Sequence, residues 1–206
     1  LHIKQADLRS TGRMIQTNGY VNWANSHPDL QVQIKGSGLS ASDLDALWPV
    51  GLSPVSRAWV TQNLNDGTIQ HARARIRMKP EYALLERFPD DAIDARFDFT
   101  GLTIDYKSGN PPLKDVAGHV TLNANALFAQ IDKANLLEQT IINDGQVEIA
   151  DLLAENPHIG ITLNANTKDD DIFHILALPD IDVADALNIE AGGIRGNAII
   201  EGGIGF

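Results

Sequence analysis

The sequence predicts a mainly β fold, built on antiparallel sheet and accompanied by a few short helices. Two observations carry this prediction. Apolar and polar residues alternate along many segments, and a period of two places successive side chains on opposite faces of a strand. Helix-like segments are few, whereas parallel α/β sheets have continuous apolar strands with a helix between them. We therefore expect strands with one face in water and one face against apolar material.

Strand patterns recur through the chain. In the segment LQVQIKG, for example, Leu30, Val32 and Ile34 alternate with polar residues. Alternation of this kind is typical of antiparallel sheet with one wet face and one dry face. We predict strands over residues 1–8, 13–24, 29–35, 68–79, 92–99, 101–107, 116–124, 126–132, 145–150, 158–166, 188–191 and 196–201.

The segment HARARIRMK alternates as well, with Ala74, Ile76 and Met78 between basic residues. The segment IDARFDF follows, where Asp94 and Asp98 alternate with apolar residues. If the two segments are neighbouring antiparallel strands, their outer faces pair Arg with Asp. A solvated, paired face is favoured over a nucleic-acid site, which would need more basic neighbours and aromatic stacking residues.

Five segments indicate helices. In SDLDALWP, Ser42 is the expected N-cap and Pro49 ends the helix. In SPVSRAWVTQNLNDG, Ser53 is the expected cap, and the residues Asn-Asp-Gly at 65–67 end the helix. The remaining three are PEYALLERFP at 80–89, DDDIFHILALP at 169–179 and DVADALN at 182–188.

Composition excludes several classes of function. The chain has 206 residues, a net charge of −11 and a pI near 4.8, which argue against partners such as nucleic acid or an anionic membrane surface. It contains no cysteine, so disulfides, thiolate catalysis and cysteine-ligated metals are excluded. No apolar run approaches the roughly 18–20 residues of a transmembrane helix. Alternating patterns at both ends predict an internal fragment of a longer protein.

No motif in the sequence indicates catalysis. There is no Gly-x-Ser-x-Gly elbow, and the glycine-rich segment AGGIRGNAIIEGGIGF lacks the Lys-Ser/Thr of a phosphate loop. Asp170 and His174 are spaced i, i+4 and could share a metal, but a solvated helix start is favoured because no further ligand has matching spacing. Trp48 and Trp59 could anchor at a lipid interface, although packing a helix on a sheet is favoured. We expect no enzyme activity, no cofactor and no metal.

The predicted apolar faces need cover, because leaving them in water costs about 25 cal/mol per Å2. A few short helices cannot cover so many strands. One solution is a second sheet or closure of the sheet on itself. The other is a long, curved sheet whose concave face is filled by an apolar ligand. The pattern alone leaves both open.

Three blocks in order resemble the large AsmA-like envelope proteins of Gram-negative bacteria, of the YhdP type. In chain order, the blocks are LWPVGLSPVSRAWVTQNLNDGTI, FDFTGLTIDYKSGNPPLKDVAG and INDGQVEIADL, and together they cover roughly residues 45–155. The first of these carries Trp48-Pro49, Ser53-Pro54, Arg57-Ala58-Trp59-Val60, Asn63-Leu64, Asp66-Gly67 and Ile69.

The resemblance implies the curved alternative: a long antiparallel sheet that forms an apolar groove, anchored through the full-length protein in the inner membrane and crossing the periplasm. Residues 1–206 would be a single groove segment, next to other segments of the same chain, that binds acyl chains and conducts phospholipids between the two membranes. A repeated Asn-Asp-Gly step into a strand hints at sub-repeats 1–90 and 91–206. About twelve strands would give roughly 55–60 Å of groove.

We predict that the groove is lined by the apolar alternates of the strands. Replacing Phe97 or Ile104 by Asp is expected to block lipid loading and leave the fold intact. An ordinary core role for many of these residues stays open, as does a non-conducting envelope scaffold or outer-membrane assembly module that binds protein strands at a sheet edge, or a closed sandwich that binds carbohydrate or acts as an enzyme. The predicted lining is Val32, Ile34, Ala74, Ile76, Met78, Ile93, Phe97, Phe99, Leu102, Ile104, Val120, Leu122, Leu127, Ile131, Val147, Ile149, Ile161 and Leu163.

Overall fold

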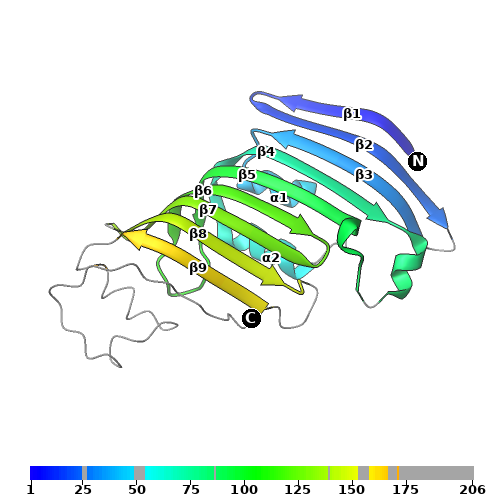
Figure 1. The fold of residues 1–206 in the computed structure, drawn as a ribbon. Helices are drawn as coiled ribbons and strands as arrows, with labels where there is room; N and C mark the ends of the chain where they lie inside the picture. Colours follow the sequence, from blue (N-terminus) through cyan, green and yellow to red (C-terminus); the bar gives the residue numbers. More distant parts are fainter. Residues whose placement is uncertain are drawn as a thin grey trace.

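A computed structural model of the chain describes residues 1–24, 27–48, 54–85, 87–138, 140–152, 158–166 and 171. These residues form one sheet of nine strands in the order of the chain, each antiparallel to the next (Figure 1). The strands are β1 His2–Ser10, β2 Arg13–Ala24, β3 His27–Ser37, β4 Leu64–Met78, β5 Ile93–Ile104, β6 Leu113–Asn123, β7 Ala126–Leu136, β8 Thr140–Ala150 and β9 His158–Asn166.

The predicted fold class is confirmed. The sheet is open, because β1 pairs only with β2 and β9 only with β8 among the described residues. It curves, and its two α-helices, α1 Ala41–Leu47 and α2 Pro54–Asn63, lie beneath the concave side (Figure 1). Within the described part of the chain, no second sheet faces the first. No helix among the described residues has the length and apolar character needed to cross a membrane.

The predicted strands 92–99 and 101–107 are one strand, β5. Its register with β6 shifts between Phe99 and Leu102, and Gly101 lies in the shift with a φ of +71°. A glycine at positive φ forms a β-bulge, which turns the following residues to the opposite phase without ending the strand. The apolar face therefore continues from Phe97 and Phe99 to Leu102 and Ile104. In the sequence, the change of phase at Gly101 had suggested that one strand ends there and another begins.

The Asn-Asp-Gly step at 65–67 also differs from the prediction. The helix α2 ends at Asn63, and β4 begins at Leu64, so the step lies inside the strand. Asp66 and Gly67 have φ values of +55° and +62°, and the glycine Cα approaches the bulge of β5, where an added Cβ would lie 2.6 Å from the Leu102 nitrogen. The later Asn-Asp-Gly lies inside β8, and Gly145 has no positive φ. The two steps therefore do not share one backbone conformation.

The helices differ from the prediction at their ends. The N-cap of α1 is Ser40 and not Ser42, because Asp43 at the third helical position accepts hydrogen bonds from the Ser40 backbone N–H and hydroxyl, both at 2.8 Å. The predicted cap Ser53 and the predicted strands and helices beyond residue 166, including Asp170 and His174, lie outside the described residues.

The expected helix at 80–89 is replaced by a 3-10 turn, η1 Pro80–Leu84, and a second 3-10 turn, η2 Asp90–Ala92, follows that segment. The Leu85 N–H donates to the Tyr82 carbonyl at 3.1 Å, an i, i+3 bond, and Leu84 and Leu85 are exposed. Tyr82 in the first turn and Ala92 in the second turn are buried. The segment therefore presents no continuous apolar stripe that an α-helix could pack against the sheet.

Candidate functional site

The concave face of the sheet carries continuous rows of apolar side chains. Directly paired residues of neighbouring strands project to the same side of a sheet, so the register defines each row. One row runs from β2 to β9 through Ile15, Gly36, Ala72, Phe97, Val120, Ala129, Val147 and Ile161. The next row runs from β3 to β8 through Ile34, Ala74, Ala95, Leu122, Leu127 and Ile149.

Every residue predicted to line the groove lies on this face. The remaining members belong to parallel rows, such as Val32, Ile76 and Ile93 across β3, β4 and β5. Bulges in β4 and β5 keep Ile69, Phe99 and Leu102 on the same side as the residues before and after them. The sequence pattern thus assigned the correct face to strands whose phase changes along their length.

Part of this face is covered by the helical region and is protein core. Phe99, Leu102 and Ile131 retain only 8%, 4% and 5% of their exposure and pack in one cluster with Leu39 and Ala41 at the start of α1. The Leu39 backbone pairs with Ile69 of β4 through bonds of 2.7 and 3.1 Å. We call this part the covered band. In this structure its side chains contact protein and cannot line an open surface.

Five other predicted lining residues border the covered band. They are partly buried and pack against its cluster, and they are Phe97, Ile104, Val120, Val147 and Leu163.

A second part of the face stays partly exposed. Its residues belong to neither buried cluster, although they lie in rows with residues that do. We call it the open band. Its residues lie on β3, β4 and β6 to β9, and the β5 residue of the same row, Ala95, is buried. The open band consists of Val32, Ile34, Ala74, Ile76, Leu122, Leu127, Ile149 and Ile161.

The 3-10 turns cover the other side of the open band. Tyr82, Ala92 and Ala124 form a small buried cluster, against which Met78 and Ile93 of the predicted lining pack. Asn125, between β6 and β7, links the sheet to the segment around η2. Its side-chain amide donates hydrogen bonds to the Phe88 carbonyl at 2.8 Å and to the Asp90 carboxylate at 2.6 Å. The open band thus lies between the helical region and the turn region.

Sequence reasoning missed the small residues of the same rows, above all Ala72, Ala95 and Ala129. The sequence did contain evidence for them, because each alanine occupies an apolar position in the alternation of its strand. Alanine is also common on solvent-exposed faces, so this evidence did not distinguish the two faces. Sequence reasoning also missed Leu39, which has no strand pattern around it and is nevertheless buried beneath the concave face.

The outer face is polar, and its predicted Arg–Asp pairing is confirmed. Arg75 pairs directly with Asp94 across β4 and β5, with 2.9 Å between guanidinium nitrogen and carboxylate oxygen. Arg77 contacts Asp91 of η2 at 2.7 Å. These side chains are about one third to two thirds exposed, so the pairs contribute little to stability.

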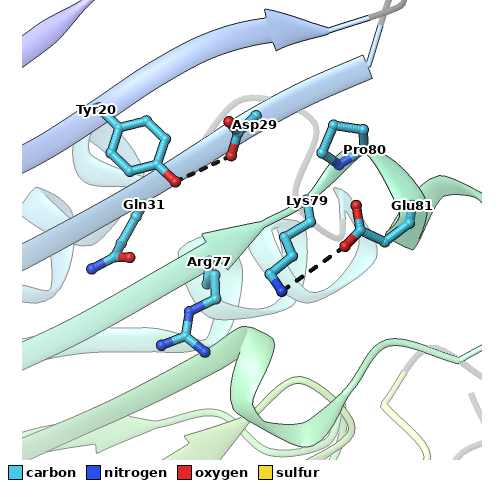
Figure 2. Close-up of a pocket in the computed structure, with 7 residues that line it drawn as sticks. All are labelled: Tyr20, Asp29, Gln31, Arg77, Lys79, Pro80 and Glu81. Atoms are coloured by element: carbon cyan, nitrogen blue, oxygen red, sulfur yellow. Dashed lines mark hydrogen bonds and ion pairs between the residues drawn. The ribbon is translucent and has the colours of Figure 1, made fainter.

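The outer face has a hollow of about 420 Å3, and Figure 2 shows the residues that line it. It is lined by Tyr20, Asp29, Gln31, Arg77, Lys79, Pro80 and Glu81. The Tyr20 hydroxyl donates to Asp29 at 3.2 Å, and this hydrogen bond raises the pKa of Tyr20 above its ordinary value. Lys79 lies 3.9 Å from Glu81. Two cations and two carboxylates balance each other here, so the hollow has no net charge.

Trp48 and Trp59 are both partly buried. Trp48 lies directly after α1, and Trp59 lies on α2.

The described residues contain no group of three His, Cys, Asp or Glu side chains that could hold a metal ion. No family model, curated protein or solved structure matches this chain.

Proposed function

We propose that this chain is a segment of a groove that binds phospholipid acyl chains and conducts them across the periplasm, in a longer, inner-membrane-anchored envelope protein of the AsmA-like, YhdP type. The observation that supports this most is the open band, a partly exposed apolar surface with residues on β3, β4, β6, β7, β8 and β9. The blocks of sequence that resemble that family support it independently.

The dimensions of the open band suit an acyl chain. Nine strands at ~4.8 Å spacing give a sheet about 38 Å wide, and the open band runs along that direction. Each methylene moved from water to apolar surroundings gains about 0.8 kcal/mol. A chain laid along the rows would therefore be held without contacts to its headgroup, and it could slide because successive strands offer similar contacts.

The open edges of the sheet fit the same proposal. β1 and β9 each leave one edge unpaired among the described residues. A neighbouring segment of the same protein that added its strands there would continue the rows of the concave face and lengthen the groove.

The same edges favour a second candidate function, a non-conducting scaffold or assembly module that captures protein strands by edge addition. β1 supports this candidate, because nearly all its residues are exposed. The two candidates differ in the required surface: the groove needs the open band, and the scaffold needs the edge.

Two adjacent residues test the groove directly. Leu127 lies in the open band, and its neighbour Phe128 lies on the outer face with 44% of its surface exposed. The protein is purified without detergent and extracted with organic solvent, and released lipids are quantified by mass spectrometry. Wild type and Phe128→Asp should release phospholipid at about one molecule per chain or more, and Leu127→Asp should release about tenfold less, because a carboxylate in the path of the tail is costly.

Lipid-free wild-type protein that is folded and monomeric would contradict the groove. Equal lipid release from both variants would contradict the placement of the lipid on the open band. Capture of an extended peptide by lipid-free protein would favour the scaffold.

A further inference from the structure

Three cations lie in one row across the outer face. Lys35 on β3 pairs directly with Arg73 on β4, and Arg73 pairs directly with Arg96 on β5. Directly opposed side chains have Cβ atoms about 5 Å apart, and like charges at such positions repel each other. Like charges therefore oppose each other in this row. Two residues further along β4, by contrast, Arg75 opposes the acidic residue Asp94.

The nearest acids on the neighbouring strand are already paired. Asp94 is held by Arg75 at 2.9 Å, and Asp98 by Arg96 at 3.0 Å. Lys35 and Arg73 are exposed, and neither forms an ion pair with another described residue. Lys35 and Arg73 therefore have no carboxylate partner within the described part of the chain.

The row borders an open hollow of about 320 Å3, lined by His71, Ala72, Arg73, Arg96 and Asp98. Lys35, Arg73 and Arg96 contribute three positive charges and Asp98 one negative charge, which leaves a surplus of two. The hollow of Figure 2 lies on the same face and has no surplus, because Asp29 and Glu81 balance Arg77 and Lys79. The excess positive charge is thus concentrated at one hollow of a chain whose net charge is −11.

We propose that this hollow binds a phosphate-type oxyanion, which is either free phosphate or the phosphodiester of a lipid headgroup. Arg73 presents a planar guanidinium whose donors match phosphate oxygens, Arg96 adds the guanidinium donors that do not contact Asp98, and Lys35 adds a point charge from the next strand. The bound anion would also relieve the repulsion along the row. The site is solvated and the protein is acidic, so we expect weak binding, with a Kd on the order of 1 mM. This proposal does not depend on the groove function.

Arg73→Gln tests the site, and Arg9→Gln is the matched control, because Arg9 is an exposed arginine on β1, outside the row. Inorganic phosphate is titrated into the full chain at constant ionic strength, and backbone amide shifts are followed by NMR. Wild type and Arg9→Gln should saturate, with the largest shifts on β3, β4 and β5. Arg73→Gln should bind at least about tenfold more weakly, because a hydrogen-bonded charge contact of about 1.5–3 kcal/mol is lost.

Thermal unfolding without phosphate separates lost binding from lost structure. Arg73→Gln should unfold at the same temperature as wild type or higher, because the substitution removes repulsion between like charges. Unfolding at a clearly lower temperature would overturn the role of Arg73 as an unbalanced charge. Shifts that never saturate, or an equal response from wild type and Arg73→Gln, would overturn the site and leave only a general ion atmosphere.

The source of the phosphate is decided with glycerophosphoglycerol, the water-soluble headgroup of an anionic phospholipid. If it saturates the same amides as tightly as inorganic phosphate, the hollow accepts a headgroup phosphodiester. If only inorganic phosphate saturates them, the hollow is a site for the free ion. Both results support an oxyanion site, and failure of both ligands to saturate overturns it.

Discussion

The covered band and the open band have the same sequence pattern and different surroundings. Leu102 alternates with polar neighbours on β5 as Leu122 does on β6, and both project from the concave face. Leu102 is buried in the main cluster, whereas Leu122 is partly exposed and belongs to neither cluster. The difference comes from Leu39 and α1, which pack on one part of the face only. Alternation therefore identifies an apolar face but does not distinguish core from binding surface.

The largest expected effect is that of a charge at the border of the covered band. Ile104 packs against the buried cluster, so Ile104→Asp would place a carboxylate among apolar side chains, which costs several kcal/mol. We expect this variant to unfold or to lose most of its stability in urea. This revises the sequence-based expectation that Ile104→Asp leaves the fold intact. A stable Ile104→Asp protein would show that the border can open to water.

Truncation to alanine compares the two bands directly. Leu102→Ala should lower the free energy of unfolding by about 3 kcal/mol, because it creates a cavity in packed core. Leu122→Ala should lower it by about 1 kcal/mol, because a side chain that is only partly buried loses less buried area. Chemical denaturation of lipid-free protein measures both. Equal losses would mean that the bands do not differ in packing.

The N-terminal cap of α1 tests how much this helix, which packs on the covered band, contributes to stability. Hydrogen bonds from Ser40, first from its backbone N–H and then from its hydroxyl, hold the pKa of Asp43 below its ordinary value, and Arg13 at 3.1 Å acts in the same direction. A carboxylate with a lowered folded-state pKa stabilises the protein above the unfolded pKa, near 3.9, and this contribution disappears as pH falls through the folded-state pKa.

We therefore expect Asp43→Asn to lower stability by about 1 kcal/mol at pH 7, and the difference from wild type to shrink below about pH 4. Unfolding curves across that pH range measure it. A constant difference down to pH 2 would show that the cap acts through something other than the charge of Asp43.

The smallest effect is expected on the outer face. Arg75→Ala removes the pair with Asp94, whose side chains are about half exposed, and should change stability by about 0–1 kcal/mol, less at high salt. The matched variant Asp94→Ala should behave in the same way. A loss above 2 kcal/mol from either variant would mean that the outer face carries stability assigned here to the concave face.

The fold was largely predictable because period two holds over most of each strand. The predictions failed where local features interrupt the pattern. Gly101 shifts the phase within β5, Gly67 lies inside β4 and not at a helix end, and Ser40 can form the capping box only because Asp43 lies three residues later. For the site, the face could be assigned from the sequence, since each strand has one apolar phase. The division into covered and open bands could not, because it depends on where the chain between β3 and β4 folds back onto the sheet.

The most direct test of the central claim places a photoactivatable cross-linker at residue 127 or residue 128 of the chain in cells or in lipid extract. These positions are adjacent in β7 and project to opposite faces. If the open band holds acyl chains, illumination should yield phospholipid adducts at 127 and few or none at 128, as read by mass spectrometry. Equal adducts at both positions, or none at 127 in folded protein, would contradict the proposal that the open band binds lipid.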